Sequence, residues 1–144
     1  MTHDERSKEV VSYVMSRNKG RDTKPEIIVR KCLFSRGLRF RKNDRRYPGQ
    51  PDVVLPKYHT VVFVHGCFWH HHEGCPHFTM PKVKLDFWEA KFNRNKQRDI
   101  LNTEKLESLG WRVIVVWECE LRKSVRDKRL KELYTEITSI SPQK

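Results

Sequence analysis

Apolar residues along the chain fall into short β-branched runs and longer stretches with helical spacing. Residues 51–55 and 60–64 form two such runs with only a few residues between them, which predicts adjacent strands with an antiparallel connection. Residues 112–118 predict a third, buried strand, because this run is rich in valine and follows Gly110. Spacing and capping residues predict the remaining elements: helices over residues 5–17, from Asp22 or Thr23 to Gly37, 85–109 (as one helix or two) and 124–139, and a short strand over 38–41.

This order of elements predicts an α/β fold, with helices on both sides of a central mixed sheet. The 144 residues, of which 37% are hydrophobic, are long enough for one domain with its own core. Residues 1–20 are expected to form an N-terminal helical arm. Neither a membrane-length apolar stretch nor a secretory signal is recognisable, so we expect a cytoplasmic protein with reduced thiols and no membrane partner.

The charge of the chain is strongly basic. Thirty Lys and Arg residues face 18 Asp and Glu residues, which leaves a formal net charge of +12 that is spread along the sequence. A solvated basic surface is the ordinary explanation. So large an excess in so small a domain nevertheless favours a polyanionic partner.

Residues 65–75 concentrate metal-binding side chains, with two cysteines, four histidines and two large aromatic residues. The spacing of Cys67, His72 and Cys75 allows three ligands to converge on one Zn²⁺, and Cys119, at the end of the third apolar run, is the best fourth ligand. Reduced, buried thiols are the alternative, and that is the expectation for Cys32 on its helix. The density and spacing favour a structural zinc site.

A second metal site is predicted at Asp52. This residue opens one predicted strand beside the place where the neighbouring strand ends at His65, so its carboxylate is expected at the end of the sheet. Carboxylate oxygens are ligands that Mg²⁺ prefers, and they do not compete for a cysteine-rich site. The sequence therefore predicts a closed structural Zn²⁺ and an open catalytic Mg²⁺.

Taken together, these segments resemble the very-short-patch-repair (Vsr) DNA mismatch endonucleases, a family with a restriction-endonuclease-like fold. The block His-Gly-Cys-Phe-Trp-His at residues 65–70 is the most specific part of the resemblance. The resemblance extends over most of the chain. The segments that carry it are residues 21–26, 48–52, 63–70, 87–88, 110–113 and 116–119.

The resemblance implies a role for each residue of the catalytic site. Asp52 and the main-chain carbonyl of Val64 would bind Mg²⁺. His70 would activate the attacking water, with assistance from His65, and Glu26 would act as a supporting acid through metal-bound water. The alternatives are that the histidines are structural and that Glu26 is an ordinary first-turn helix residue favoured by the helix dipole.

The resemblance also implies the residues that hold zinc and DNA. Cys67, His72, Cys75 and Cys119 fall on the zinc ligands, and Phe68, Trp69 and Trp88 fall on aromatic residues that enter DNA. Trp88 could instead belong to the core. Lys91, Arg94 and Arg98 recur at helical spacing, which suits phosphate binding, although a solvated helix face is the alternative. The arm over residues 1–20 is expected to contact DNA as well.

Two departures from the usual patterns stand out. Nucleases of this fold commonly pair the aspartate with a second acidic residue and a lysine, but the corresponding stretch here is Val64-His65-Gly66. An imidazole at His70 can replace the lysine as proton acceptor. The spacing between His72 and Cys75 leaves His71 or His77 as alternative zinc ligands.

The implied activity is that of a Mg²⁺-dependent, strand-specific DNA endonuclease. It would nick at T:G mismatches, which arise from deamination of 5-methylcytosine, and leave a 5′-phosphate. A nuclease with different or relaxed specificity, linked to restriction-modification, is the first alternative, and a non-catalytic zinc-stabilised DNA-binding module is the second. A zinc nucleobase deaminase is disfavoured because the Pro-Cys-x-x-Cys segment is absent. Expected partners are mismatched duplex DNA and mismatch-repair proteins, with the chain a monomer.

Overall fold

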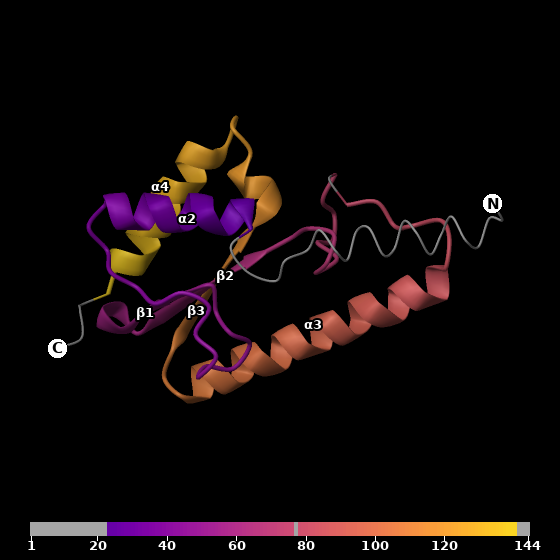
Figure 1. Cartoon of the computed structure of the whole chain (residues 1–144), viewed down its shortest axis with the longest axis horizontal. Coiled ribbons are helices and arrows are strands. Elements are labelled where there is room, and N and C mark those ends of the chain that lie inside the picture. Colours follow the sequence, from indigo (N-terminus) through magenta and orange to yellow (C-terminus); the bar gives the residue numbers. More distant parts are fainter. Residues whose placement is uncertain (1–22, 77, 141–144) are drawn as a thin grey trace.

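The computed structural model describes residues 23–76 and 78–140, which fold around one small sheet (Figure 1). Strands β1 and β2 are antiparallel, whereas β2 and β3 are parallel, and the strand order is β1-β2-β3. The elements in chain order are α2 (Lys24–Ser35), β1 (Val53–Leu55), η1 (Pro56–Tyr58), β2 (Thr60–His65), α3 (Leu85–Ser108), β3 (Arg112–Trp117), η2 (Glu118–Leu121) and α4 (Arg126–Thr138). The predicted α/β class with a mixed sheet is confirmed.

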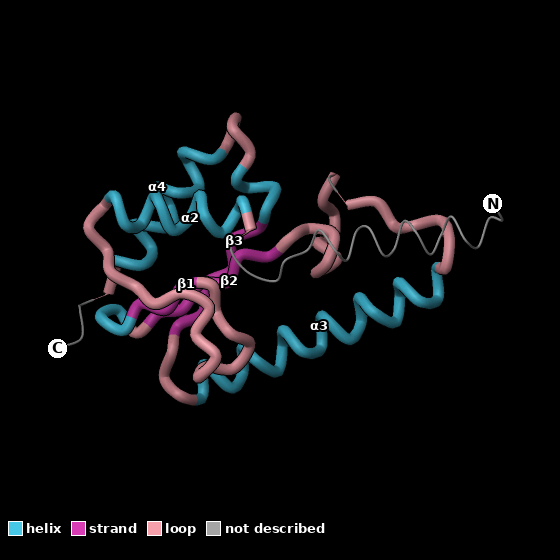
Figure 2. Tube along the Cα trace, in the orientation of Figure 1, coloured by secondary structure: helices cyan, strands magenta, loops and turns pink. Residues whose placement is uncertain are grey.

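Helices α2 and α4 cover one face of the sheet and α3 covers the other (Figures 1 and 2). Successive side chains of a strand point to opposite faces, and the strands consist mostly of apolar residues, so both faces of the sheet are apolar. On one face Val62 and Val116 pack against Leu33 of α2 and Leu133 of α4 in the larger core. The smaller core on the other face is made by Val54, Val61 and Leu106.

The topology brings three strand ends together. Because β1 runs antiparallel to β2, the start of β1 lies beside the end of β2, and Asp52 directly precedes β1. Because β3 runs parallel to β2, its last residue Trp117 pairs with His65. This end of the sheet therefore gathers polar and aromatic side chains from segments far apart in sequence.

Helix α3 extends well beyond the sheet, alongside the segment that leads from β2 to α3 (Figure 2). Aromatic rings fill the space between the two. Phe68 lies 5.1 Å from Trp88 and 5.3 Å from Phe92, measured between ring centroids. This packing anchors the loop after β2 on the helix.

Most predicted elements are confirmed, with differences at two places. Residues 85–108 form a single helix, since no glycine or proline interrupts them. Residues 38–41 were expected to form a strand, but only Arg41 makes a bridge, to Val54. The chain turns away soon afterwards, at Asn43 with its positive φ of 49°. The predicted arm over residues 1–20, including the helix over 5–17, lies outside the described residues, and none of the described helices is long and apolar enough for a membrane crossing.

Candidate functional site

Asp52 is held at the end of the sheet by the neighbouring strand. Its Oδ2 atom accepts a hydrogen bond of 2.6 Å from the backbone N–H of Val64, and the residue is only 9% exposed. Glu26, in the first turn of α2, is 4% exposed and forms a buried ion pair of 2.6 Å with Arg30. The first turn of α2 thus places a second carboxylate beside the strand ends.

The electrostatics of Asp52 favour a bound cation. Burial raises the pKa of Asp52 to about 8, and the nearby charge of Glu26 adds to this effect, while the Val64 N–H and Arg30 oppose it. A carboxylate is costly to ionise where it is buried beside another carboxylate. A divalent cation that prefers oxygen ligands, such as Mg²⁺, would offset this cost, so Asp52 and Glu26 fit such an ion.

His65, which follows the Asp52-bound residue Val64, stacks on His70. Their ring centroids lie 3.8 Å apart with an angle of 2° between the planes. Nδ1 of His70 lies 2.6 Å from Oδ2 of Asp99 on α3. Burial, assisted by the charge of His70, lowers the pKa of His65 to about 4, so His65 is neutral at physiological pH. We refer to Asp52, Glu26, His65, His70 and Asp99 as the histidine–carboxylate site.

Asp99 is a member of this site that sequence reasoning missed. The buried residues Trp88, Phe92 and Asn95 lie along one stripe of α3, and Asp99 follows Asn95 by four positions. An acidic residue on the buried stripe of a helix needs a partner. The acidic residue on this buried stripe is therefore the feature of the sequence that could have identified Asp99. Its partner in the structure is His70.

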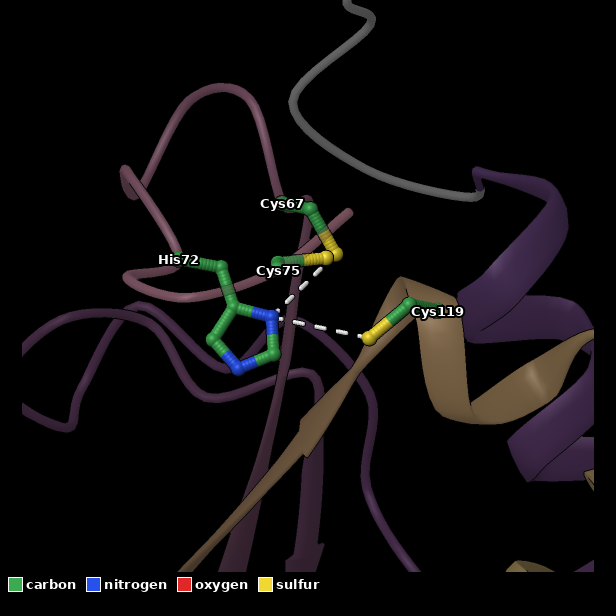
Figure 3. A group of neighbouring side chains, drawn as sticks. All are labelled: Cys67, His72, Cys75 and Cys119. Atoms are coloured by element: carbon green, nitrogen blue, oxygen red, sulfur yellow. Dashed lines mark hydrogen bonds between the residues drawn. The ribbon is translucent and has the colours of Figure 1, made fainter. Parts of the chain in front are cut away.

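Three cysteines and one histidine converge beside this site (Figure 3). Cys67, His72 and Cys75 come from the loop after β2, and Cys119 comes from η2. Nδ1 of His72 lies 3.6 Å from Sγ of Cys67 and 3.5 Å from Sγ of Cys119. All four candidate ligand atoms lie within 4.8 Å of one another. We refer to these four residues as the cysteine–histidine cluster.

The chemistry of this cluster fits a soft divalent metal ion. Four sulfur and nitrogen donors form the usual set for a tetrahedral structural site. Burial raises the pKa of the Cys67 thiol to about 12, and a bound cation would compensate for ionising it. His71, one of the alternative ligands, instead stacks on Phe78 with ring centroids 4.3 Å apart, and His77 is outside the described residues.

The aromatic residues predicted to enter DNA differ in exposure. Phe68 and Trp69 are half-buried in the loop after β2, whereas Trp88 is 3% exposed and its neighbour Phe87 is 40% exposed. The side-chain amide of Asn95 donates a hydrogen bond of 2.8 Å to the carbonyl of Trp69. In this structure Trp88 packs in the aromatic cluster, and its insertion into DNA stays a prediction.

The predicted phosphate-binding residues lie on the same helix. Arg94 and Arg98 are exposed and Lys91 is half-buried, with its Nζ 5.9 Å from the centre of the Trp69 ring. Arg98 donates a hydrogen bond to the side chain of Asn95. Lys91 and, through Asn95, Arg98 therefore lie near the loop that carries Trp69.

Comparison with known proteins places this arrangement in a family. A family model described as "DNA mismatch endonuclease Vsr" matches residues 3–77. The chain is 53% identical over 127 residues to "Type II nicking enzyme V.NmeAIP" of Neisseria meningitidis serogroup A, which covers 88% of this chain and 90% of that protein. It is 45% identical over 116 residues to "DNA mismatch endonuclease Vsr" of Escherichia coli, covering 81% and 72% respectively. The chain therefore belongs to the Vsr DNA mismatch endonuclease family and is a DNA endonuclease.

Proposed function

We propose that this endonuclease nicks one strand of duplex DNA at T:G mismatches, depends on Mg²⁺, and leaves a 5′-phosphate. The description of the matching family names mismatched DNA, and two relatives in Neisseria meningitidis and Xanthomonas oryzae are named nicking enzymes. One observation carries the proposal at the level of chemistry. The buried carboxylate of Asp52, which suits a divalent cation, binds the backbone N–H of Val64, and the next residue, His65, stacks on His70, whose ring contacts Asp99.

The histidine pair supplies the proton chemistry. Asp99 occupies Nδ1 of His70, which leaves Nε2 as the atom that takes a proton from the attacking water. The neutral His65, stacked on His70, holds the plane of that ring. This arrangement takes the place of the lysine that is missing after Val64.

Asp52 and the main-chain carbonyl of Val64 would bind the metal ion, with Glu26 as a supporting acid. When bound there, Mg²⁺ would supply positive charge to the phosphate oxygens and lower the pKa of the water. The mixed sheet, with Asp52 at the start of β1, is consistent with a restriction-endonuclease-like fold, which we include in the proposal.

The cysteine–histidine cluster is proposed to hold a structural Zn²⁺. It joins the loop after β2 to the end of β3, two segments that are about fifty residues apart in the chain. The ion would fix the loop that carries His70 and Trp69. Its effect on catalysis would then be indirect.

Recognition is proposed to combine a basic surface with an aromatic wedge. Phe68 and Trp69 would enter the duplex where base pairs separate, which costs least at a mismatch. Lys91, Arg94 and Arg98 would hold phosphates nearby and contribute to binding of any sequence. We also propose that Trp88 supports the wedge or enters DNA with it.

A nicking assay with strand-specific labels tests the proposal. Duplexes that differ only at one T:G, T:A or C:G pair are incubated with and without Mg²⁺, and the product ends are probed with a phosphatase and a ligase. We expect cleavage of the T strand of the T:G duplex only, with Mg²⁺ only, and ligatable 5′-phosphate ends. Equal cleavage of all three duplexes would instead support a nuclease of relaxed specificity, and cleavage without divalent cations would refute the role of Asp52.

A further inference from the structure

Trp117 is a neighbour of both groups of candidate functional residues. It is the last residue of β3, pairs with His65 across the sheet, and precedes Cys119 by two positions. Its backbone N–H donates a hydrogen bond of 2.7 Å to Oε1 of Glu120, which fixes the chain where β3 passes into η2. Trp117 is neither a proposed zinc ligand nor a proposed proton-transfer residue, so its aromatic side chain has no role in the proposed function so far.

The indole of Trp117 connects the two groups through ring contacts. It stacks on His72, with centroids 3.9 Å apart and planes at 3°. It meets His65 nearly at right angles, with centroids 5.2 Å apart and planes at 78°. Since His65 stacks on His70, four rings form one continuous array from the cysteine–histidine cluster to the histidine proposed to activate water.

The loop after β2, which carries His70 and His72, needs contacts that fix the orientation of these two rings. His70 and His72 are separated only by His71, whose φ of 45° lies in the left-handed region. Asp99 holds one nitrogen of His70, but a single hydrogen bond does not define the plane of an imidazole. The stack on His65 defines that plane, and Trp117 lies nearly at right angles to both rings, with its centroid 5.2 Å from that of His65 and 6.4 Å from that of His70.

We propose that Trp117 is a positioning residue for nicking, whose indole holds His65 and His70 in a fixed orientation relative to the cysteine–histidine cluster. This inference rests on the proposed function of the site. A residue that orients a catalytic group through an intermediate contact typically changes activity 10- to 100-fold when it is replaced. A residue that only fills space would change stability and leave the turnover of folded protein unaltered.

The opposite end of β3 provides a matched control. Trp111 stacks on His59, with centroids 4.2 Å apart, and lies at 79° to Tyr47. Like Trp117, Trp111 packs against a histidine ring. It directly precedes β3, at the end of the strand opposite to the cysteine–histidine cluster and the histidine–carboxylate site. Replacing Trp111 therefore removes equivalent aromatic packing without touching the histidines of the site.

The first test compares the kinetics of Trp117→Leu, Trp117→Phe and Trp111→Leu on the T:G duplex, with zinc content measured on each protein. We expect kcat of Trp117→Leu to fall about 10- to 100-fold with KM within about threefold of wild type. Trp117→Phe, which keeps a flat ring, should recover most of the loss, and Trp111→Leu should keep the wild-type kcat. Wild-type kcat in zinc-loaded Trp117→Leu, or an equal loss in Trp111→Leu, would overturn the inference.

A second measurement does not depend on activity. In ¹⁵N-histidine-labelled protein we expect ring-to-ring nuclear Overhauser effects from Trp117 to both His65 and His72, and we expect the imidazole signals of His65 and His70 to shift in Trp117→Leu but not in Trp111→Leu. Missing cross-peaks in the wild type would overturn the inference even if the leucine variant does not fold. A wild-type enzyme that shows the cross-peaks but does not nick the T:G duplex would contradict the proposed function alone.

Discussion

The cysteine–histidine cluster and the histidine–carboxylate site draw on the same loop after β2, yet they are built for different chemistry. The first takes three residues from the loop and adds Cys119 from η2. The second takes His70 from the loop and its other residues from the strand ends and from helices α2 and α3. The first has sulfur and nitrogen donors that suit a closed zinc site, whereas the second has carboxylates and imidazoles that suit Mg²⁺ and proton transfer. The comparison shows that neighbouring residues of one loop can belong to two sites that differ in the type of ligand atom and therefore in the chemistry that each site suits.

The two sites should therefore respond differently to substitution. Damage to the first should affect folding and metal content, and damage to the second should lower turnover in protein that stays folded and keeps its zinc. The predictions below test this separation and the roles of neighbouring residues.

Removal of a proposed zinc ligand should have the largest effect. Cys119→Ala breaks the link between the loop and β3, and metal-binding energy in such sites is folding energy, on the order of 10 kcal/mol for small zinc domains. We expect loss of about one equivalent of zinc and an unfolded or insoluble product, measured by elemental analysis and circular dichroism. Cys32→Ala, which removes a half-buried thiol of α2 outside the cluster, should keep its zinc. A folded Cys119→Ala protein with full zinc would contradict the structural role.

Substitutions at the other site should abolish nicking and leave the fold intact. Asp52→Ala and His70→Ala remove the proposed metal ligand and the group that activates water, and loss of such a group typically lowers the rate by ~10² to 10⁴. Single-turnover nicking measures the loss, while zinc content and binding to the T:G duplex should persist. A rate within tenfold of wild type in either variant would refute its assignment.

Asp99→Asn should have an intermediate effect, because it weakens the orientation of His70 without removing the imidazole. We expect a 10- to 100-fold lower kcat with little change in KM, as is typical for a carboxylate that orients a functional histidine. Asp86→Asn, an exposed aspartate in the first turn of the same helix, is the control and should be neutral. Equal activities of the two variants would show that the contact between Asp99 and His70 is dispensable.

Trp69→Ala should reduce discrimination between T:G and T:A duplexes by roughly 1 to 3 kcal/mol, the usual value for lost stacking on a base. Arg94→Ala should instead weaken binding to both duplexes and reduce the salt dependence, because it removes a proposed phosphate contact. Affinities measured across a salt series separate the two effects. If Trp69→Ala weakened binding to both duplexes equally, the wedge would be refuted.

The smallest expected effect concerns pH. Folded Asp52 keeps its proton to about pH 8, whereas the unfolded chain releases it near the ordinary pKa of 3.8, so the free energy of unfolding should fall as pH rises through this window. The slope is at most ~1.4 kcal/mol per pH unit. Urea unfolding without Mg²⁺ between pH 7 and 8 limits the contribution of His65, which titrates between its lowered pKa of about 4 in the folded protein and the ordinary 6.5.

Asp52→Asn is the control for the pH experiment. Its profile should be flatter than that of wild type, and added Mg²⁺ should stabilise only the wild type near pH 8. Identical slopes for the two proteins would show that the buried carboxylate is not the group responsible.

Local sequence patterns determined much of the fold and part of the site. The runs at residues 51–55 and 60–64 predicted an antiparallel strand pair, and this pairing necessarily places Asp52 near the end of the following strand. The short spacing of Cys67, His72 and Cys75 allows these side chains to converge. Cys119 can join them because it follows β3, which lies parallel to β2, the strand before their loop. These features were predictable because strand adjacency and loop length act over short stretches of chain.

Only the tertiary structure decided which residues of α3 take part. Helical spacing places Trp88, Asn95 and Asp99 on one face of α3, but it does not say where along the sheet that face lies. Packing of α3 against the loop after β2 buried Trp88, brought Asn95 to the Trp69 carbonyl and set Asp99 against His70. The contacts of Asn95 and Asp99 join residues 26 and 29 positions apart, so they depend on how whole elements pack and not on any local pattern.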